Sequence, residues 1–281
     1  MTVMLHKYDK IKSSLLLAFA AAGGAAISGT AAAATGSCSL ENGYSMDLAS
    51  YVAEASDCIE MAQNFDSTIA NDLFIALNAD RAAQGLAPLN RRASLDMAAK
   101  AHALDMSVRI YADHVDHEGR DHLHRIRAFD RTMLVGASGS NVAVSLAADN
   151  ALSVHETIKR DQFNSDNMMR GAFTDVGIGV VEEAGQYYVV QVFAAAEGDF
   201  YQAIPVSAKG SQPLKASLTD RDRQVIAWGL VDSVSGEMLA RSTMPRVRFN
   251  NLNGTDSAAL DVLVSVRNDT FVLKGPLVSG R

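Results

Sequence analysis

The densest group of side chains that could do chemistry lies between residues 111 and 124. Four histidines and four acidic residues stand there: His114, His117, His122 and His124, with Asp113, Asp116, Glu118 and Asp121. Imidazole and carboxylate bind zinc and related ions, so one interpretation is a metal site that activates a water molecule for hydrolysis. The other is a solvated loop whose charges pair locally, because the spacing of these histidines matches no established ligand motif.

Other candidate groups are weaker. The segment 136–140 resembles the turn around a nucleophilic serine but lacks the last glycine. Gly177-Ile178-Gly179 lacks the third glycine and the following helix of a dinucleotide-binding loop, so we interpret it as glycines within a strand. His102 and His155 lie on predicted helices, where we expect packed or surface residues rather than ligands.

Helices are predicted before the histidine-rich loop. Apolar residues recur at helical spacing between Tyr51 and Ala62, and a second helix is predicted over 67–84 with Gly85 as its C-terminal cap. A third helix is predicted to start near Ser94, and a short one to end at Phe129.

Strands dominate after the loop. We expect a strand over 141–146, a helix capped by Asp149, and a hairpin of 176–181 with 187–193. Helices followed by interleaved strands indicate an α+β sandwich. Beyond Pro205 five short β-prone runs predict a small all-β appendage: Val225–Val231, Met238–Ser242, Arg246–Phe249, Leu260–Val266 and Thr270–Leu273. We see no catalytic constellation in that region.

Seven motifs in order resemble one family. They are Leu77 to Leu89 (LNADRAAQGLAPL), Ala99 to Met106 (AKAHALDM), Asp113-His114 before Glu118-Gly119, Arg125-Ile126, Gly139 to Ala143 (GSNVA), Phe163 to Met169 (FNSDNMM), and Phe173 to Val180 with Tyr187 to Phe193. This set resembles the CAP superfamily, the cysteine-rich secretory, antigen 5 and pathogenesis-related proteins, in its bacterial secreted form. The resemblance covers residues 69–196 and implies a three-layer α-β-α sandwich.

The resemblance also implies a cleft with two histidines and two acidic residues, which bind zinc or another divalent metal in some members. His114 matches the first histidine, whereas Ser140 stands for the glutamate and Asn164 for the second histidine. Asp161 is aligned with the second acid. Serine and asparagine are poor ligands, so we expect zinc to bind this cleft weakly and no catalytic residue to be assigned with confidence.

Three functions follow as expectations. The leading one is a non-enzymatic module that binds a lipid, a glycan or an envelope protein. The alternative is a metal-assisted hydrolase or peptidase that uses His114 and the neighbouring histidines 117, 122 and 124. A third is a structural role in which the appendage docks a partner.

The N-terminus has the pattern of a secretory signal. Lysines precede an apolar stretch from Leu15 to Ile27, and small residues end at Ala34, so we expect cleavage before Thr35. A membrane anchor is the competing interpretation, but this apolar stretch is shorter than the ~20 residues that span a bilayer. Cys38 and Cys58 would then meet an oxidising compartment, so we expect a disulfide rather than two free thiols.

The expected organisation is therefore a signal peptide (1–34), a helical lead-in with the disulfide (35–68), a CAP-like domain (69–196) and a β-rich domain (206–281). The whole chain has 25 basic and 32 acidic residues, a net charge of −7. An acidic chain disfavours nucleic acid as a partner, because that partner requires clustered lysines and arginines. We expect a secreted or periplasmic protein that is not integral to a membrane once the signal is removed.

Overall fold

The computed structural model describes residues 38–280 except 148, 253 and 268. The predicted signal peptide lies outside this range. No helix among the described residues is both long enough and apolar enough to cross a bilayer. The predicted disulfide is confirmed, because Cys38 and Cys58 are bonded and tie the start of the described chain to the first helix.

The helices are α1 (Leu48–Met61), α2 (Ser67–Ala83), α3 (Ala93–Arg109), α4 (His122–Phe129), α5 (Ala151–Arg160) and α6 (Gln162–Met168). Most of them begin at an acidic or amide cap. Asp47, Asp66, Asp121, Asn150 and Asp161 each accept a hydrogen bond from a backbone N–H of the first turn. Such caps satisfy N–H groups that the helix itself leaves unpaired.

The central sheet is built from β1 (Asn90–Arg91), β2 (Met133–Leu146), β3 (Asp175–Glu183) and β4 (Gln186–Phe200), in the order β1-β3-β4-β2. The strands β3 and β4 form the predicted hairpin, and its turn residues Ala184 and Gly185 both have positive φ. Only the short β1–β3 pair is parallel among these described strands.

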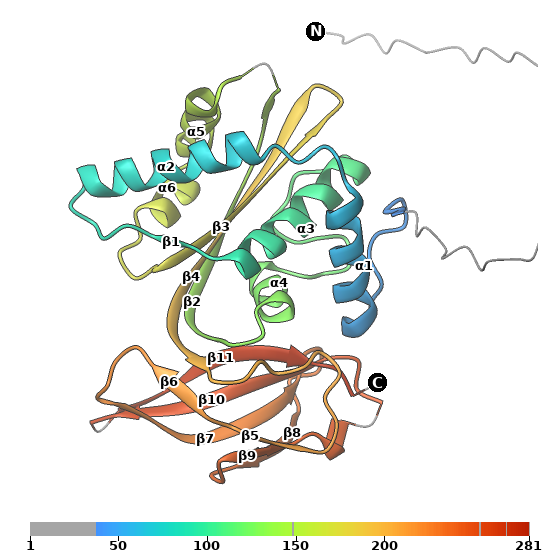
Figure 1. The fold of residues 1–281 in the computed structure, drawn as a ribbon, viewed down its shortest axis with the longest axis vertical. Coiled ribbons are helices and arrows are strands. Elements are labelled where there is room, and N and C mark those ends of the chain that lie inside the picture. The colour runs from blue at the N-terminus through green and yellow to red at the C-terminus, as the bar shows by residue number, and fades with distance from the viewer. Residues whose placement is uncertain (1–37, 148, 253, 268, 281) are drawn as a thin grey trace, which may run out of the picture. The chain divides into compact units, whose positions relative to one another are not determined.

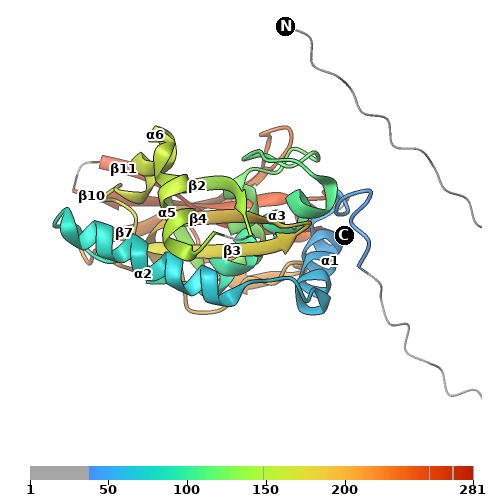
Figure 2. The same cartoon turned by 90° about the horizontal axis from the view of Figure 1, so that it is seen from above.

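The helices cover both faces of this sheet, which confirms the α-β-α sandwich. Figure 1 shows α1, α3 and α4 on one side of β2, β3 and β4, and α2, α5 and α6 on the other. Figure 2 shows α2 and α5 next to each other along the strands. Side chains alternate between the two faces of β4, so this strand contributes to both cores. Val190 and Val192 pack with α1 and α3, while Val189 and Phe193 pack with α2 and α5.

Glycines 177 and 179 allow α3 to approach β3 closely. A Cβ on Gly177 would lie 2.0 Å from the backbone carbon of Leu95, and one on Gly179 would lie 2.6 Å from that of Ala99. Both distances are shorter than real contacts, so a side chain at either position would push the helix away. The interpretation of these glycines as strand residues is confirmed.

The C-terminal region is the predicted β appendage. Its elements are β5 (Ser211–Pro213), β6 (Ala216–Leu218), β7 (Arg223–Asp232), β8 (Met238–Ser242), β9 (Arg246–Arg248), the 3-10 helix η1 (Asn250–Leu252), β10 (Ala258–Val266) and β11 (Asp269–Val278). They surround a hydrophobic core that is distinct from the cores on the two faces of the central sheet and includes Trp228, Leu230, Phe249 and Leu260.

The appendage is continuous with the sandwich. Lys274 of β11 pairs with Val135 of β2, so the sheet order extends through β11, β10, β7 and β8. The buried Arg127 of α4 donates from Nε to the carbonyl of Gly275 at 2.5 Å and from Nη2 to Asp261 at 2.7 Å. Packing thus continues across the expected domain boundary at residue 206. That residues 206–281 form a separate domain stays a prediction.

Several predicted boundaries were wrong. The strand expected over 141–146 begins at Met133, so the segment 136–140 lies within β2 and not in a turn. Helix α5 is capped by Asn150 instead of Asp149. Helix α3 begins at Ala93, as expected near Ser94, but Ser94 is not its cap: Arg92 precedes the helix, and Ser94 donates its hydroxyl hydrogen to Asp130.

Candidate functional site

A cleft opens beside β2 where α5, α6 and the loop after α3 meet it. Its volume is about 560 Å³, within the range of small-molecule sites. The lining residues are His114, Val142, Ala143, Val144, Thr157, Asp161, Phe163 and Asn164. Three of the four residues aligned with the family's cleft therefore lie at this cavity.

The fourth, Ser140, is buried beside His114. Its Oγ lies 3.0 Å from Nδ1 of His114, so these two side chains form a hydrogen bond. Asp161 is the cap of α6 and accepts from the backbone N–H of Asn164 at 2.9 Å. The structure thus brings His114, Ser140, Asp161 and Asn164 together around one cleft.

Arg125 of α4 positions the loop that carries His114. Its guanidinium is 1% exposed and donates from Nη2 to the carbonyl of His114 at 2.7 Å and from Nη1 to that of Arg120 at 2.6 Å. The motif comparison includes Arg125 but predicts no role for it at the site. The sequence feature that could have indicated this role is an arginine on a short predicted helix directly after the histidine-rich loop.

The surroundings of His114 favour its neutral imidazole. Burial lowers its pKa below the usual value; the Arg125 guanidinium acts in the same direction, while Asp113 and Asp161 oppose it. A neutral imidazole has one N–H donor and one acceptor nitrogen. Since Nδ1 faces Ser140, Nε2 is the nitrogen available for other contacts.

Amide side chains form a buried network beside the cleft. Asn141 donates to the carbonyl of Asn164 and to Oε1 of Gln191, both at 3.0 Å, and Asn167 donates to Oδ1 of Asn141 at 3.1 Å. Asn164 Nδ2 donates to the carbonyl of Val142 at 3.4 Å, whereas its Oδ1 is buried and has no partner among the described residues. Most buried acceptors are paired, so this oxygen is an exception among the residues that line the cleft.

None of the other loop histidines lines this cleft. The ring of His117 lies 4.3 Å from that of Tyr111, and His124 packs against Tyr51 with ring centroids 6.0 Å apart. Burial lowers the pKa of His124 to about 4, and it also lowers that of His122, which lies against the backbone of Ser138. Within the described part of the chain, the histidines of this loop form no group with ligand atoms close enough to share an ion.

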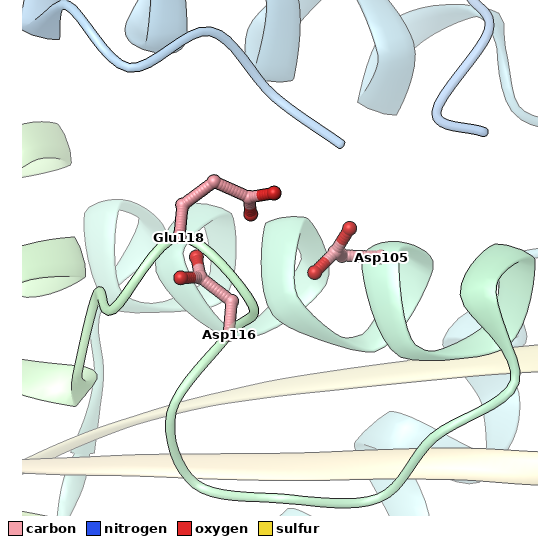
Figure 3. A group of neighbouring side chains, drawn as sticks. All are labelled: Asp105, Asp116 and Glu118. Carbon is pink, nitrogen blue, oxygen red and sulfur yellow. The ribbon is translucent and has the colours of Figure 1, made fainter. Parts of the chain in front are cut away.

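A cluster of three carboxylates does have that spacing. Oxygens of Asp105, Asp116 and Glu118 lie within 4.8 Å of one another. Figure 3 shows Asp105 on α3 and the other two on the loop that returns beside this helix. No motif in the sequence predicted this cluster, although Asp105 and Arg109 have the spacing of four residues that favours ion pairs in a helix.

Two arginines already neutralise most of this charge. Arg109 contacts Asp105 at 2.6 Å and Glu118 at 2.7 Å, and Arg120 contacts Asp116 at 2.8 Å and Glu118 at 3.1 Å. The hydroxyl of Tyr111 donates to Asp105 at 2.5 Å. The expected local pairing of loop charges is therefore present, but it is largely buried and links the loop to α3.

The cleft does not fit the family's metal. Zinc sites use about four ligands, or three with a water molecule, drawn from imidazole, thiolate and carboxylate. Here one imidazole and one carboxylate are present, Ser140 is occupied by His114, and Asp161 caps a helix. We therefore derive no chemistry through a metal in this cleft.

Comparisons with known proteins identify a family for the sandwich region. Residues 74–193 match the model of the cysteine-rich secretory protein family, CAP. No curated protein matches the chain.

Two similar solved structures are bacterial. An outer surface protein from Borrelia burgdorferi is 14% identical, with a TM-score of 0.43, and the match covers 48% of this chain and 99% of that one. An extracellular protein containing a SCP domain from Bacillus anthracis str. Ames is 20% identical, with a TM-score of 0.39, and the match covers 45% of this chain and 40% of that one.

Proposed function

Because residues 74–193 form a domain of the CAP, or cysteine-rich secretory protein, family, we propose that this chain is an exported binding protein without enzymatic activity. Its ligand is a small amphipathic molecule that lies in the cleft beside His114. The disulfide between Cys38 and Cys58 supports export, because such bonds persist in oxidising compartments.

The observation that carries the proposal is the composition of the cleft. A cavity of about 560 Å³ has apolar walls from Val142, Val144 and Phe163 and a few polar groups at one side. Phe163 is 60% exposed and lines this cavity, so its ring is accessible to a ligand there. Apolar walls with a few fixed polar groups are typical of small-molecule sites.

An apolar probe tests this directly. Titration of n-octanol into the protein, followed by calorimetry or by protein NMR, should show saturable binding. Phe163→Ala should weaken it about tenfold, since burial of the exposed ring against the ligand contributes roughly 1–2 kcal/mol. Tyr201→Ala is the matched control, because Tyr201 is a similarly exposed aromatic residue that does not line the cleft. Absence of binding, or equal effects of the two variants, would refute the proposal.

A hydrolase is the second candidate because His114 forms a hydrogen bond with the Ser140 hydroxyl. Such a pair could transfer a proton during ester or peptide cleavage. Ser140 is only 2% exposed, which disfavours direct attack on a substrate. Activity against ester and peptide panels that disappears in both His114→Gln and Ser140→Ala would favour this function over simple binding.

A further inference from the structure

The polar side of the cleft has hydrogen-bond acceptors and few free donors. Asp161 contributes an exposed carboxylate, and Asn164, whose buried Oδ1 has no partner among the described residues, lines the cavity beside it. The Thr157 hydroxyl already donates to the carbonyl of Ser153 at 3.0 Å, and the Asn164 amide donates to that of Val142. A ligand group that contacts Asp161 must therefore bring a donor of its own, while Nε2 of His114 stays available to other groups of the ligand.

Asp161 also lacks a matching cation among the described residues. Its Oδ1 accepts from the backbone of Asn164, and the nearby Lys159 contacts Asp80 and Glu156 instead. The buried Arg125 directs two of its nitrogens to backbone carbonyls, so it does not neutralise the carboxylate by contact.

The apolar side can also favour a cation. The Phe163 ring contacts that of His114 edge-on, with centroids 5.7 Å apart. Phe163 also lines the cavity. A cation near an aromatic face gains about 0.5–1 kcal/mol at exposed sites. The Asp161 carboxylate and the Phe163 ring therefore line the same cavity.

We infer that the cleft selects amphiphiles whose head group is a hydrogen-bond-donating cation, such as an alkylammonium, over neutral or anionic amphiphiles of the same length. This inference rests on the proposed function, because it requires that the apolar body of the ligand lies in the cleft. The head group contacts Asp161 and Asn164, and the alkyl part packs on Val142, Val144 and Phe163.

A matched series of ligands separates the two proposals. Octylammonium, n-octanol and octanoate have the same chain and differ in the head group, and each is titrated into the full chain at low salt, where ion pairs are least screened. We expect octylammonium to bind about fivefold tighter than octanol, the effect of a partly exposed ion pair, and octanoate to bind weakest.

The variant Asp161→Asn removes the charge without removing the cap, because asparagine caps helices as well as aspartate does. It should reduce the preference for octylammonium over octanol to less than about twofold. Asp121→Asn is the control, since Asp121 is also an exposed helix cap but lies on α4 outside the lining. Thermal melts followed by circular dichroism establish that both variants fold.

Each outcome has one meaning. If none of the three ligands binds, the proposed function fails and this inference fails with it. If octanol binds but octylammonium binds no tighter, the apolar cleft stands and the cation preference is overturned. The preference is also overturned if Asp161→Asn leaves it unchanged, or if Asp121→Asn removes it equally.

Discussion

The carboxylate cluster on α3 and the cleft beside His114 both contain acidic groups, and they differ in what surrounds those groups. In the cluster, Asp105, Asp116 and Glu118 are matched by Arg109 and Arg120. In the cleft, Asp161 has no cation in contact among the described residues, and Asn164 has an unpaired acceptor. Buried charges persist when they are paired, so the first arrangement is explained by structure alone. The second leaves polar groups for a ligand.

The largest effect should follow from breaking the cluster. Arg120→Ala leaves the buried Asp116 without its closest cation and also removes the contact of the guanidinium with the Tyr51 ring. Loss of one partner of a buried pair costs about 3–5 kcal/mol of the free energy of unfolding, which urea denaturation measures. A loss below about 1 kcal/mol would show that the cluster is not structural.

The loss of stability at acidic pH should depend on His124, whose pKa is lowered by burial and is also influenced by Arg120 and Asp116 of the cluster. Its pKa is about 4 in the folded protein against 6.5 in the unfolded chain, so the unfolded state binds the extra proton first. The contribution of His124 to stability should be constant above about pH 6.5, and up to about 3 kcal/mol of it should be lost as the pH decreases to about 4. His124→Gln should flatten this slope more than His114→Gln, because His124 is the more buried imidazole. Equal slopes in both variants would contradict this assignment.

Rebuilding the family's ligands should turn the cleft into a metal site. The double variant Ser140→Glu with Asn164→His restores the side chains that the family resemblance places there. We expect zinc affinity, measured by calorimetry, to rise by roughly 100-fold, since a carboxylate and an imidazole are added to His114 and Asp161. His114→Ala in this background should abolish the gain. Submicromolar zinc binding by the unaltered protein that is lost in His114→Ala would instead show that the existing cleft is a metal site.

The smallest stability effect should come from the cleft wall. Phe163→Ala removes a ring that is 60% exposed, so the free energy of unfolding should change by less than about 0.5 kcal/mol. Its free energy of unfolding from urea denaturation is compared with that of Arg120→Ala. A small loss in Phe163→Ala and a large one in Arg120→Ala would distinguish a residue that contacts ligand from one that stabilises the fold. A loss above about 2 kcal/mol would mean that Phe163 packs as a core residue.

Much of the fold followed from local sequence patterns. The hairpin of β3 and β4 was predicted from its turn at Ala184-Gly185, and β8 was predicted with its observed bounds. The start of β2 was not, because the segment 136–140 has low strand propensity and becomes a strand by pairing with β4. The pairing of Lys274 with Val135 was also missed, since contacts between residues so distant in the chain leave no local pattern.

The candidate site was predicted from the resemblance to the CAP superfamily more than from the chemistry of the individual residues. The motifs identified His114, Ser140, Asp161 and Asn164, but not the roles of the exposed Phe163 or the buried Arg125. Exposure of one ring and burial of one guanidinium are outcomes of tertiary packing, and residue type alone predicts the opposite for both. The arginine partners of the carboxylates had a visible spacing, yet the return of the loop onto α3 was needed to bring them together.

The most direct test of the account is the position of a bound amphiphile. A crystal structure with octylammonium should show the alkyl chain against Val142, Val144 and Phe163, with the ammonium within hydrogen-bond distance of Asp161. A ligand found only in the hollow around Tyr201 and Lys215 of the appendage, with the cleft beside His114 containing none, would contradict it.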